Sequence, residues 1–94
     1  MTAKEVRAGY LIESGASNTR RASQLLRKAN EFQSAVWLEN TEGKFNAKSL
    51  LGILQAIKSS GGMIKISADG FDEDIAVEDL GYFIEHGLRA FERD

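Results

Sequence analysis

The segment from Asn46 to Ile57 constrains the fold more than any other part of the chain, because it joins a helix start to an unusually broad apolar surface. Ser49 can accept a hydrogen bond from an early helical N–H group, so it is a natural N-cap. The residues from Leu50 to Ile57 are almost all apolar. The sequence therefore predicts a short helix that begins just after Ser49.

The apolar residues of this helix cover more of its circumference than a half-buried helix needs. At about 100° per residue, Leu50 and Leu54 lie at the border of the core side and Leu51 points well away from it. The apolar arc is roughly 200° wide, whereas a stripe of about 100° is enough. Because a small chain has few elements with which to cover both sides, we expect a docking surface beside Ser49. The alternative is a central helix that is covered all round. The residues expected in the core are Ile53, Ala56 and Ile57.

Composition narrows the classes of function. The length predicts one domain over residues 1–94, and a net charge of −2 gives no electrostatic attraction to nucleic acid or an anionic membrane. No apolar run approaches the length of a membrane-spanning helix, and Met1 to Val6 lack the apolar core of a signal peptide, so we expect a cytoplasmic protein. With no cysteine and one histidine, His86, we expect neither a metal nor a cofactor.

The first half of the chain predicts three strands and one helix. Asn18 is a good N-cap for the helix, and the turn from Asn40 to Gly43 makes a hairpin of the second and third strands. The alternation of apolar residues sets the first strand, and helical spacing of apolar residues sets the helix. The expected elements are a strand over Val6–Ile12, a helix over Thr19–Glu31, and strands over Ala35–Glu39 and Lys44–Ala47.

The second half adds the Ser49 helix, a fourth strand over Met63–Ala68 and a long final helix over Glu73–Glu92. The carboxylates at the start of the final helix suit its dipole. The order is β-α-β-β-α-β-α, and each expected strand has one apolar face. The sequence therefore predicts an α+β fold, a four-stranded antiparallel sheet with three helices on one face.

Three stretches resemble the phosphocarrier HPr family of the bacterial phosphotransferase system: Ala22–Ser34, Asn46–Leu54 and Ile66–Glu73. The second stretch, with its Lys48-Ser49 pair, is similar to the regulatory-serine motif of that family and is the most specific of the three. The resemblance extends from about Val6 to Ile84. It implies a single HPr-like domain with the open-faced sandwich of that family, which agrees with the element order.

The loop before the first helix departs from the family pattern. Phosphate-carrying members have Gly-x-His-Ala-Arg-Pro there, and the aligned run here is Ala16 to Arg21. The resemblance places Asn18 at the position of the phosphorylated histidine and Arg20 at that of a phosphate-contacting arginine, whereas Arg21 replaces a proline. An amide nitrogen is not nucleophilic near pH 7, whereas a neutral imidazole nitrogen is. We therefore expect no phosphoryl transfer through Asn18 and no enzymatic activity. His86, in the last helix, is expected to be a solvated helical residue.

The resemblance also implies that a dedicated kinase phosphorylates Ser49 and that the modified protein binds a transcriptional regulator. A phosphate at a helix N-terminus meets free N–H groups and the positive end of the dipole. The partners expected are therefore proteins, either the serine kinase/phosphorylase or a regulator, and the chain is a monomer or a weak homodimer. The partner-binding residues expected are Arg20, Lys48, Leu50, Leu51 and Leu54.

Three hypotheses stay open from the sequence. The first is a histidine-less regulatory protein, like the catabolite-repression members of the family, that acts through Ser49. The second is a working phosphocarrier that uses another acceptor. The third is an HPr-like binding module without any phosphorylation. For Arg21 we expect an exposed, solvated side chain, and for Arg20 a role in holding an anion or an acidic partner.

Overall fold

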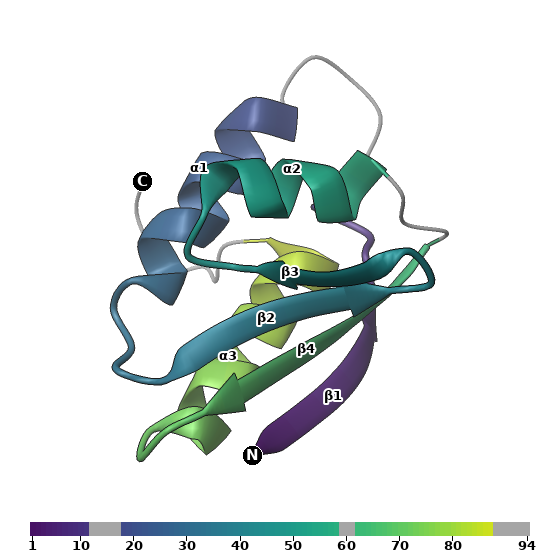
Figure 1. Cartoon of the computed structure of the whole chain (residues 1–94). Helices are drawn as coiled ribbons and strands as arrows, with labels where there is room; N and C mark the ends of the chain where they lie inside the picture. The colour runs from purple at the N-terminus through teal and green to yellow at the C-terminus, as the bar shows by residue number, and fades with distance from the viewer. Residues whose placement is uncertain (12–17, 59–61, 88–94) are drawn as a thin grey trace.

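The computed structural model describes residues 1–11, 18–58 and 62–87. Of Asn18 it describes the backbone only. Its seven elements follow the expected order β-α-β-β-α-β-α (Figure 1). Four strands form one sheet in the order β1-β4-β2-β3, and every neighbouring pair in it is antiparallel. The elements are β1 (Thr2–Arg7), α1 (Asn18–Ala29), β2 (Ala35–Asn40), β3 (Gly43–Asn46), α2 (Leu50–Lys58), β4 (Met63–Asp69) and α3 (Glu73–His86).

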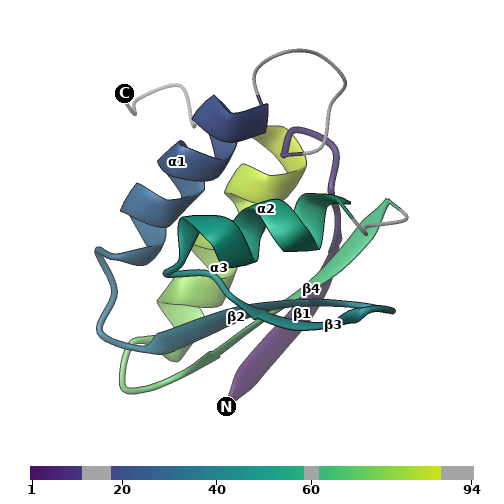
Figure 2. The same cartoon turned by 45° about the horizontal axis from the view of Figure 1, so that its top comes forward.

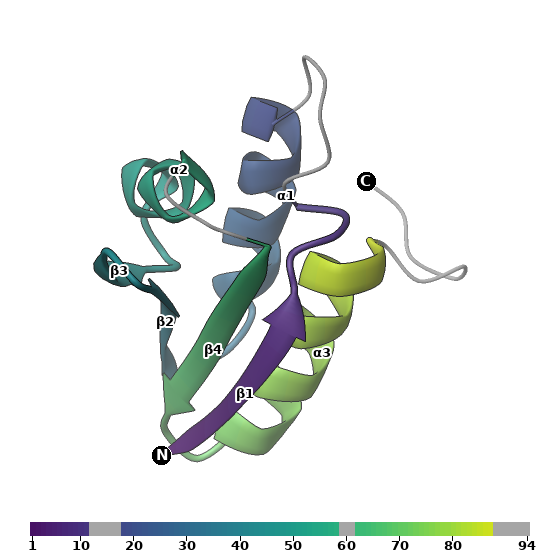
Figure 3. The ribbon, with the colours of Figure 1, turned by 90° about the vertical axis from the view of Figure 1, so that its right-hand side faces the viewer.

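The core lies between one face of the sheet and the three helices (Figures 2 and 3). Alternate strand residues such as Val6, Leu38 and Ile66 are buried, whereas Glu5 and Lys65 on the opposite face are exposed. α3 packs on β1 and β4, and α2 packs on β2 and β3. The predicted open-faced sandwich is therefore confirmed, and none of the described helices covers the other face of the sheet.

The first strand differs from the prediction. It begins at Thr2 and ends at Arg7, whereas the alternation of apolar residues had placed it over Val6–Ile12. Its polar N-terminal half becomes a strand because its backbone pairs with β4, from Thr2 opposite Ala68 to Arg7 opposite Met63. The hydroxyl of Thr2 also donates to the carboxylate of Glu73 at 2.7 Å. Ile12 lies outside the described residues.

The last helix is shorter than predicted. It ends at His86, because Gly87 adopts φ 89° and its N–H donates to the carbonyl of Phe83 at 2.8 Å. A positive φ of this kind closes helices at glycine, which has no Cβ to clash. The apolar spacing that had extended the helix to Glu92 rests on Leu88 and Phe91, which lie outside the described residues.

The β4–α3 turn is tied to the loop after α1. The carboxylate of Asp72 accepts hydrogen bonds from the N–H groups of Gln33, at 2.8 Å, and Ser34, at 3.0 Å, and also from the Ser34 hydroxyl. The Ser34 hydroxyl bond is the main reason that the pKa of Asp72 lies below its usual value. At Gly70, a Cβ would lie 2.7 Å from the Cα of Ser34, so the turn needs glycine at that position. These contacts hold the start of α3 against the start of β2.

Candidate functional site

Ser49 lies at the junction of β3 and α2, as expected, and caps the helix. Its Oγ accepts a hydrogen bond from the N–H of Gly52 at 3.2 Å, three residues into the helix. Its backbone N–H donates to the carbonyl of Asn46 at 3.2 Å, and its carbonyl accepts from Ile53 at 2.9 Å. The side chain is half-buried. The predicted N-cap is confirmed, with the hydroxyl at the positive end of the helix dipole.

The first turn of α2 packs directly on the end of β3. A Cβ at Gly52 would lie 2.6 Å from the carbonyl oxygen of Asn46, closer than any side chain can approach. The side-chain oxygen of Asn46 accepts a hydrogen bond from the N–H of Lys48 at 2.8 Å, which forms an Asx turn. The strand end and the absence of a side chain at Gly52 together determine where the Ser49 hydroxyl lies.

The sides of α2 are distributed as the sequence predicted. Leu51 is 66% exposed, and Leu50 and Leu54 are half-buried against the core. The opposite side is buried and consists of Gly52, Ile53, Ala56 and Ile57. The structure therefore places an exposed leucine and two half-buried ones within the first turns of the helix that Ser49 caps. We name Leu50, Leu51 and Leu54 the Leu51 patch.

Lys48 is held by the fold. Its ammonium donates to the carbonyl oxygen of Phe32 at 2.7 Å, in the turn that follows α1, and its side chain is half-buried. Because the first turn of α2 and the end of α1 are far apart in sequence, nothing in the local pattern indicated this bond. Lys48 thus stabilises the contact between two segments beside Ser49.

The start of α1 carries Arg20 and Arg21, and Arg21 contacts Tyr10. Asn18 is the first residue of the helix, and its side chain lies outside the described part of the chain. Arg20 is exposed. The guanidinium of Arg21 lies 4.2 Å from the ring centroid of Tyr10 and donates to the Tyr10 carbonyl at 2.8 Å. The expectation of a solvated Arg21 is therefore wrong, because the side chain anchors the segment before the loop.

Tyr10 is also held by α3. Its ring meets that of Phe83 edge-on, with centroids 5.3 Å apart, and its hydroxyl donates to the side-chain oxygen of Gln24 at 3.3 Å. Its N–H donates to the carbonyl of Ile84 at 3.1 Å. Sequence reasoning assigned Tyr10 to a strand and missed this role. The available signal was Arg21 in the first turn of α1, a position that the helix dipole makes unfavourable for a cation without a partner.

His86 is exposed in the last turn of α3, as predicted. Its Nε2 lies 3.7 Å from a carboxylate oxygen of Glu85, and its ring lies 4.9 Å from that of Tyr82. Both contacts are within the same helix, and neither involves α2 or Ser49. Within the described ranges, no three histidine, cysteine or acidic side chains come close enough to hold a metal ion. None of the helices among those residues has the length and apolar character needed to cross a membrane.

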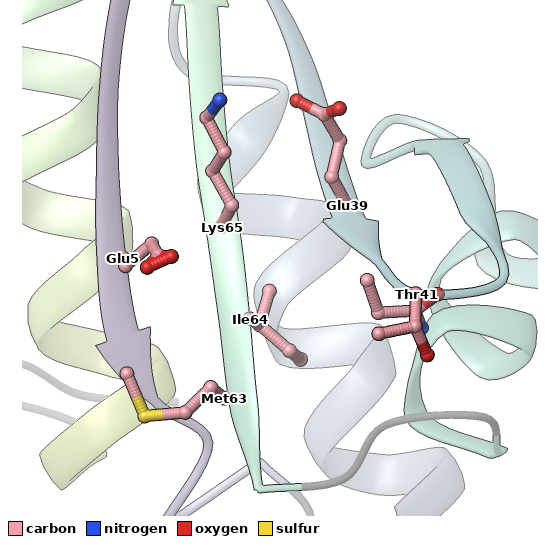
Figure 4. Close-up of a pocket in the computed structure, with 7 residues that line it drawn as sticks. Glu5, Glu39, Thr41, Met63, Ile64 and Lys65 are labelled. Carbon is pink, nitrogen blue, oxygen red and sulfur yellow. The ribbon is translucent and has the colours of Figure 1, made fainter.

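A hollow of about 300 Å³ lies on the helix-free face of the sheet, away from Ser49 (Figure 4). Glu5, Lys65 and Glu39 are opposite one another on β1, β4 and β2. The signs of charge alternate across the three strands, so the Lys65 ammonium lies between two carboxylates and the three side chains sum to one negative charge. We assign it no function.

Comparison with known proteins identifies the family. Residues 13–86 match the family model described as the PTS HPr component phosphorylation site. The chain is 38% identical over 66 residues to the HPr-like protein Crh of Halalkalibacterium halodurans, covering 70% of this chain and 79% of that protein. It is 30% identical over 73 residues to the phosphocarrier protein HPr of Neisseria meningitidis serogroup A, covering 72% of this chain and 82% of that protein.

Solved structures of HPr and Crh proteins are similar to this fold. The phosphocarrier protein HPr from Bacillus anthracis superimposes with a TM-score of 0.76 at 28% identity, covering 89% of this chain and 96% of that one. Crh of Bacillus subtilis, solved as a swapped, intertwined dimer, superimposes with a TM-score of 0.68 at 30% identity, covering 89% of this chain and 88% of that one. The matched family model, the Crh-like sequence and the open-faced sandwich together show that the chain belongs to the HPr family of the phosphotransferase system.

Proposed function

We propose that this chain is a regulatory member of the HPr family that acts by protein contact and does not carry phosphate on histidine. The observation that carries the proposal is the position of its single histidine. His86 lies exposed in the last turn of α3, whereas α1 begins with Asn18, where the resemblance aligns the phosphorylated histidine. A carboxamide cannot replace the imidazole as a nucleophile, so the chain lacks the group that the family uses to accept phosphate.

Ser49 is the proposed point of control. Its hydroxyl is half-buried at the N-terminus of α2, and a phosphate there would meet the N–H groups of the first turn. The adjacent Leu51 is 66% exposed and supplies an apolar contact beside the charge. We propose that a serine kinase modifies Ser49 and that a protein partner, such as a transcriptional regulator, then reads the phosphate together with the Leu51 patch. The similarity of the chain to Crh of Halalkalibacterium halodurans and to Crh of Bacillus subtilis, which is described as a catabolite repression HPr, supports a regulatory role over phosphate carriage alone.

Lys48 and Arg20 have different proposed parts. Because the Lys48 ammonium already bonds the Phe32 carbonyl, its contribution to binding is to hold the first turn of α2 in place. Arg20 is exposed and remains a proposed contact for an acidic partner. We propose no catalytic residue, no metal and no cofactor for the chain, and we propose that it works in the cytoplasm.

The test is incubation of the chain with ATP and an HPr serine kinase from a bacterium that encodes a Crh, followed by intact-mass and peptide mass spectrometry. We expect one phosphoryl group on Ser49 and none on the Ser49→Ala variant. Ser23, on α1, serves as a matched serine, and Ser23→Ala is expected to be modified as fully as the natural chain. If no phosphate is added, or if it is added equally to Ser49→Ala, the proposed control through Ser49 is wrong.

A further inference from the structure

Two large apolar side chains at the start of α3 are exposed. Phe71 is 88% exposed and Ile75, four residues later, is 61% exposed. The residue before a helix N-cap often packs on the fourth helical residue, which here is Ala76. Ala76 is fully buried, whereas Phe71 extends into solvent. Phe71 therefore adds little to the packing of its own helix, and together with Ile75 it offers apolar surface for contact with another molecule.

The surroundings of this pair are acidic. The chain from Ile66 to Gly87 contains seven carboxylates and no lysine or arginine. Asp69, two residues before Phe71, and Asp74, directly before Ile75, are both exposed. Among the described residues, the Met1 ammonium lies 3.0 Å from Glu73, and the Lys4 ammonium lies 3.3 Å from Glu78. The described carboxylates of this segment outnumber these two cations. We name Phe71, Ile75, Asp69 and Asp74 the Phe71 patch.

The Leu51 patch has the opposite electrostatic setting. α1 and α2 together contain five lysines and arginines and no carboxylate. α1 packs beside α2 and carries exposed Arg20 and Arg27, and α2 ends on exposed Lys58. The β4–α3 turn lies at the end of the molecule where the chain begins, whereas α2 lies toward the other end (Figures 1 and 3). One molecule thus presents an acidic apolar patch and a basic apolar patch on separate surfaces.

We propose that the Phe71 patch of one copy docks on the Leu51 patch of a second copy. The apolar side chains supply the contact. The charges around the two patches are of opposite sign, so they favour the pairing of the two different patches over the pairing of two identical ones. Because the two patches differ, the contact is head to tail, and each docked copy leaves one patch open for the next. The contact area is small, so the association is transient and weakens as salt screens the charges.

This self-association has a functional consequence and does not depend on phosphorylation of Ser49. A copy seated on the Leu51 patch covers the surface proposed above for the protein partner, so the two interactions compete. Self-association of this kind also differs from strand exchange, because it needs no element to leave its own chain and reverses on dilution.

The test is sedimentation velocity, with ¹⁵N NMR spectra, from low micromolar concentration to about 1 mM. A head-to-tail Kd on the order of 1 mM predicts an about twofold rise in weight-average mass over this range, with shifts at both patches, and reversal by added salt. Phe71→Ser and Leu51→Ser alone are each expected to stay monomeric. Mixed together, they are expected to form dimers and nothing larger, because one complementary pair of patches remains.

Met63→Ser is the control, because Met63 is 50% exposed on the helix-free face of the sheet and lies in neither patch. It is expected to self-associate as the natural chain does. The proposal is overturned if the mass of the natural chain does not change with concentration, if either single variant still self-associates, or if the mixture stays monomeric. Shifts confined to one patch would also overturn it, because they would show like pairing with like.

Discussion

The Oγ of Ser49 accepts the N–H of Gly52 at 3.2 Å, so the oxygen proposed to receive phosphate is the one that already caps α2. The same pair explains why the helix begins where it does, because Gly52 lets the first turn lie against Asn46. Capping and modification therefore depend on one geometry. A phosphate on Ser49 would replace a single neutral acceptor with several charged oxygens at the positive end of the helix.

Replacing Ser49 with alanine removes the cap and should lower the free energy of unfolding by about 1 kcal/mol, since an N–H of the first turn loses its acceptor. Ser49→Asp keeps an acceptor and adds a charge that the dipole favours, so its stability should equal or exceed that of the natural chain. Urea denaturation measures both. Equal stability of the Ser49→Ala variant and the natural chain would show that the cap is dispensable.

Gly52→Ala should destabilise the chain although alanine is the better helix former. Propensity alone would favour alanine by about 1 kcal/mol, but its Cβ would lie 2.6 Å from the Asn46 carbonyl oxygen, and relief of such overpacking typically costs about 1–3 kcal/mol. Gly81→Ala in α3 is the matched control, because its nearest neighbour is a Val6 methyl at 3.4 Å. Thermal unfolding of the two variants should separate them, with Gly52→Ala the less stable. The reverse order would contradict the close packing of α2 on β3.

Arg21→Ala should lower the free energy of unfolding by about 1–2 kcal/mol, because it removes both a cation–π contact and a hydrogen bond to Tyr10. The exposed Arg27 on the same helix provides the comparison, and Arg27→Ala should change stability by less than about 0.5 kcal/mol. Chemical denaturation of both variants gives the difference. If Arg27→Ala lowers the free energy of unfolding as much as Arg21→Ala does, the contact between Arg21 and Tyr10 has no special role in stability.

Glu73 should make the fold sensitive to acid. The Thr2 hydroxyl bond, followed by the Gly70 N–H and the Met1 ammonium, lowers the pKa of Glu73 from 4.5 to about 2. A carboxylate whose pKa is depressed in the folded state stabilises the fold when the pH is above the pKa of the same group in the unfolded chain. This contribution is lost as the pH falls from 4.5 toward about 2. Glu73→Gln should therefore be less stable at pH 7, and its stability should change less with pH over that window.

The control for Glu73 is Glu42→Gln, in the exposed β2–β3 turn. Stability curves measured by urea unfolding at several pH values should show the acid-dependent loss in the natural chain and in Glu42→Gln alike. If Glu73→Gln keeps the full loss between pH 4.5 and about 2, another group governs the acid sensitivity.

The sequence was sufficient to predict the features that depend on local pattern. The order of elements, the cap at Ser49 and the exposure of Leu51 all follow from residues close together in the chain, and the structure confirms them. The length of β1 was predicted wrongly, because pairing with β4 makes a strand of residues whose own pattern is polar. α3 ends early for a different reason: the apolar periodicity passes through Gly87, and its positive φ outweighs that pattern.

The contacts around the candidate site residues could be predicted only in part, for the same reason. The bonds from Lys48 to Phe32 and from Arg21 to Tyr10 join segments that are distant or differently assigned in the sequence, and long side chains of this type read as solvated cations until their neighbours are known. No role was predicted for Phe71, and its 88% exposure does not follow from a local sequence pattern. The roles of Asn18 and Ser49 remain proposals.

The central claim is that the chain cannot carry phosphate because Asn18 replaces the family's imidazole. The most direct measurement incubates the natural chain with phosphoenolpyruvate and the general phosphotransferase enzyme, and reads the intact mass before and after brief acid treatment. Asn18→His places an imidazole at the position of the family's phosphorylated histidine, and His86→Ala removes the imidazole that the natural chain has. The account predicts no phosphoryl group on the natural chain or on His86→Ala. An acid-labile phosphoryl group on the natural chain would contradict it.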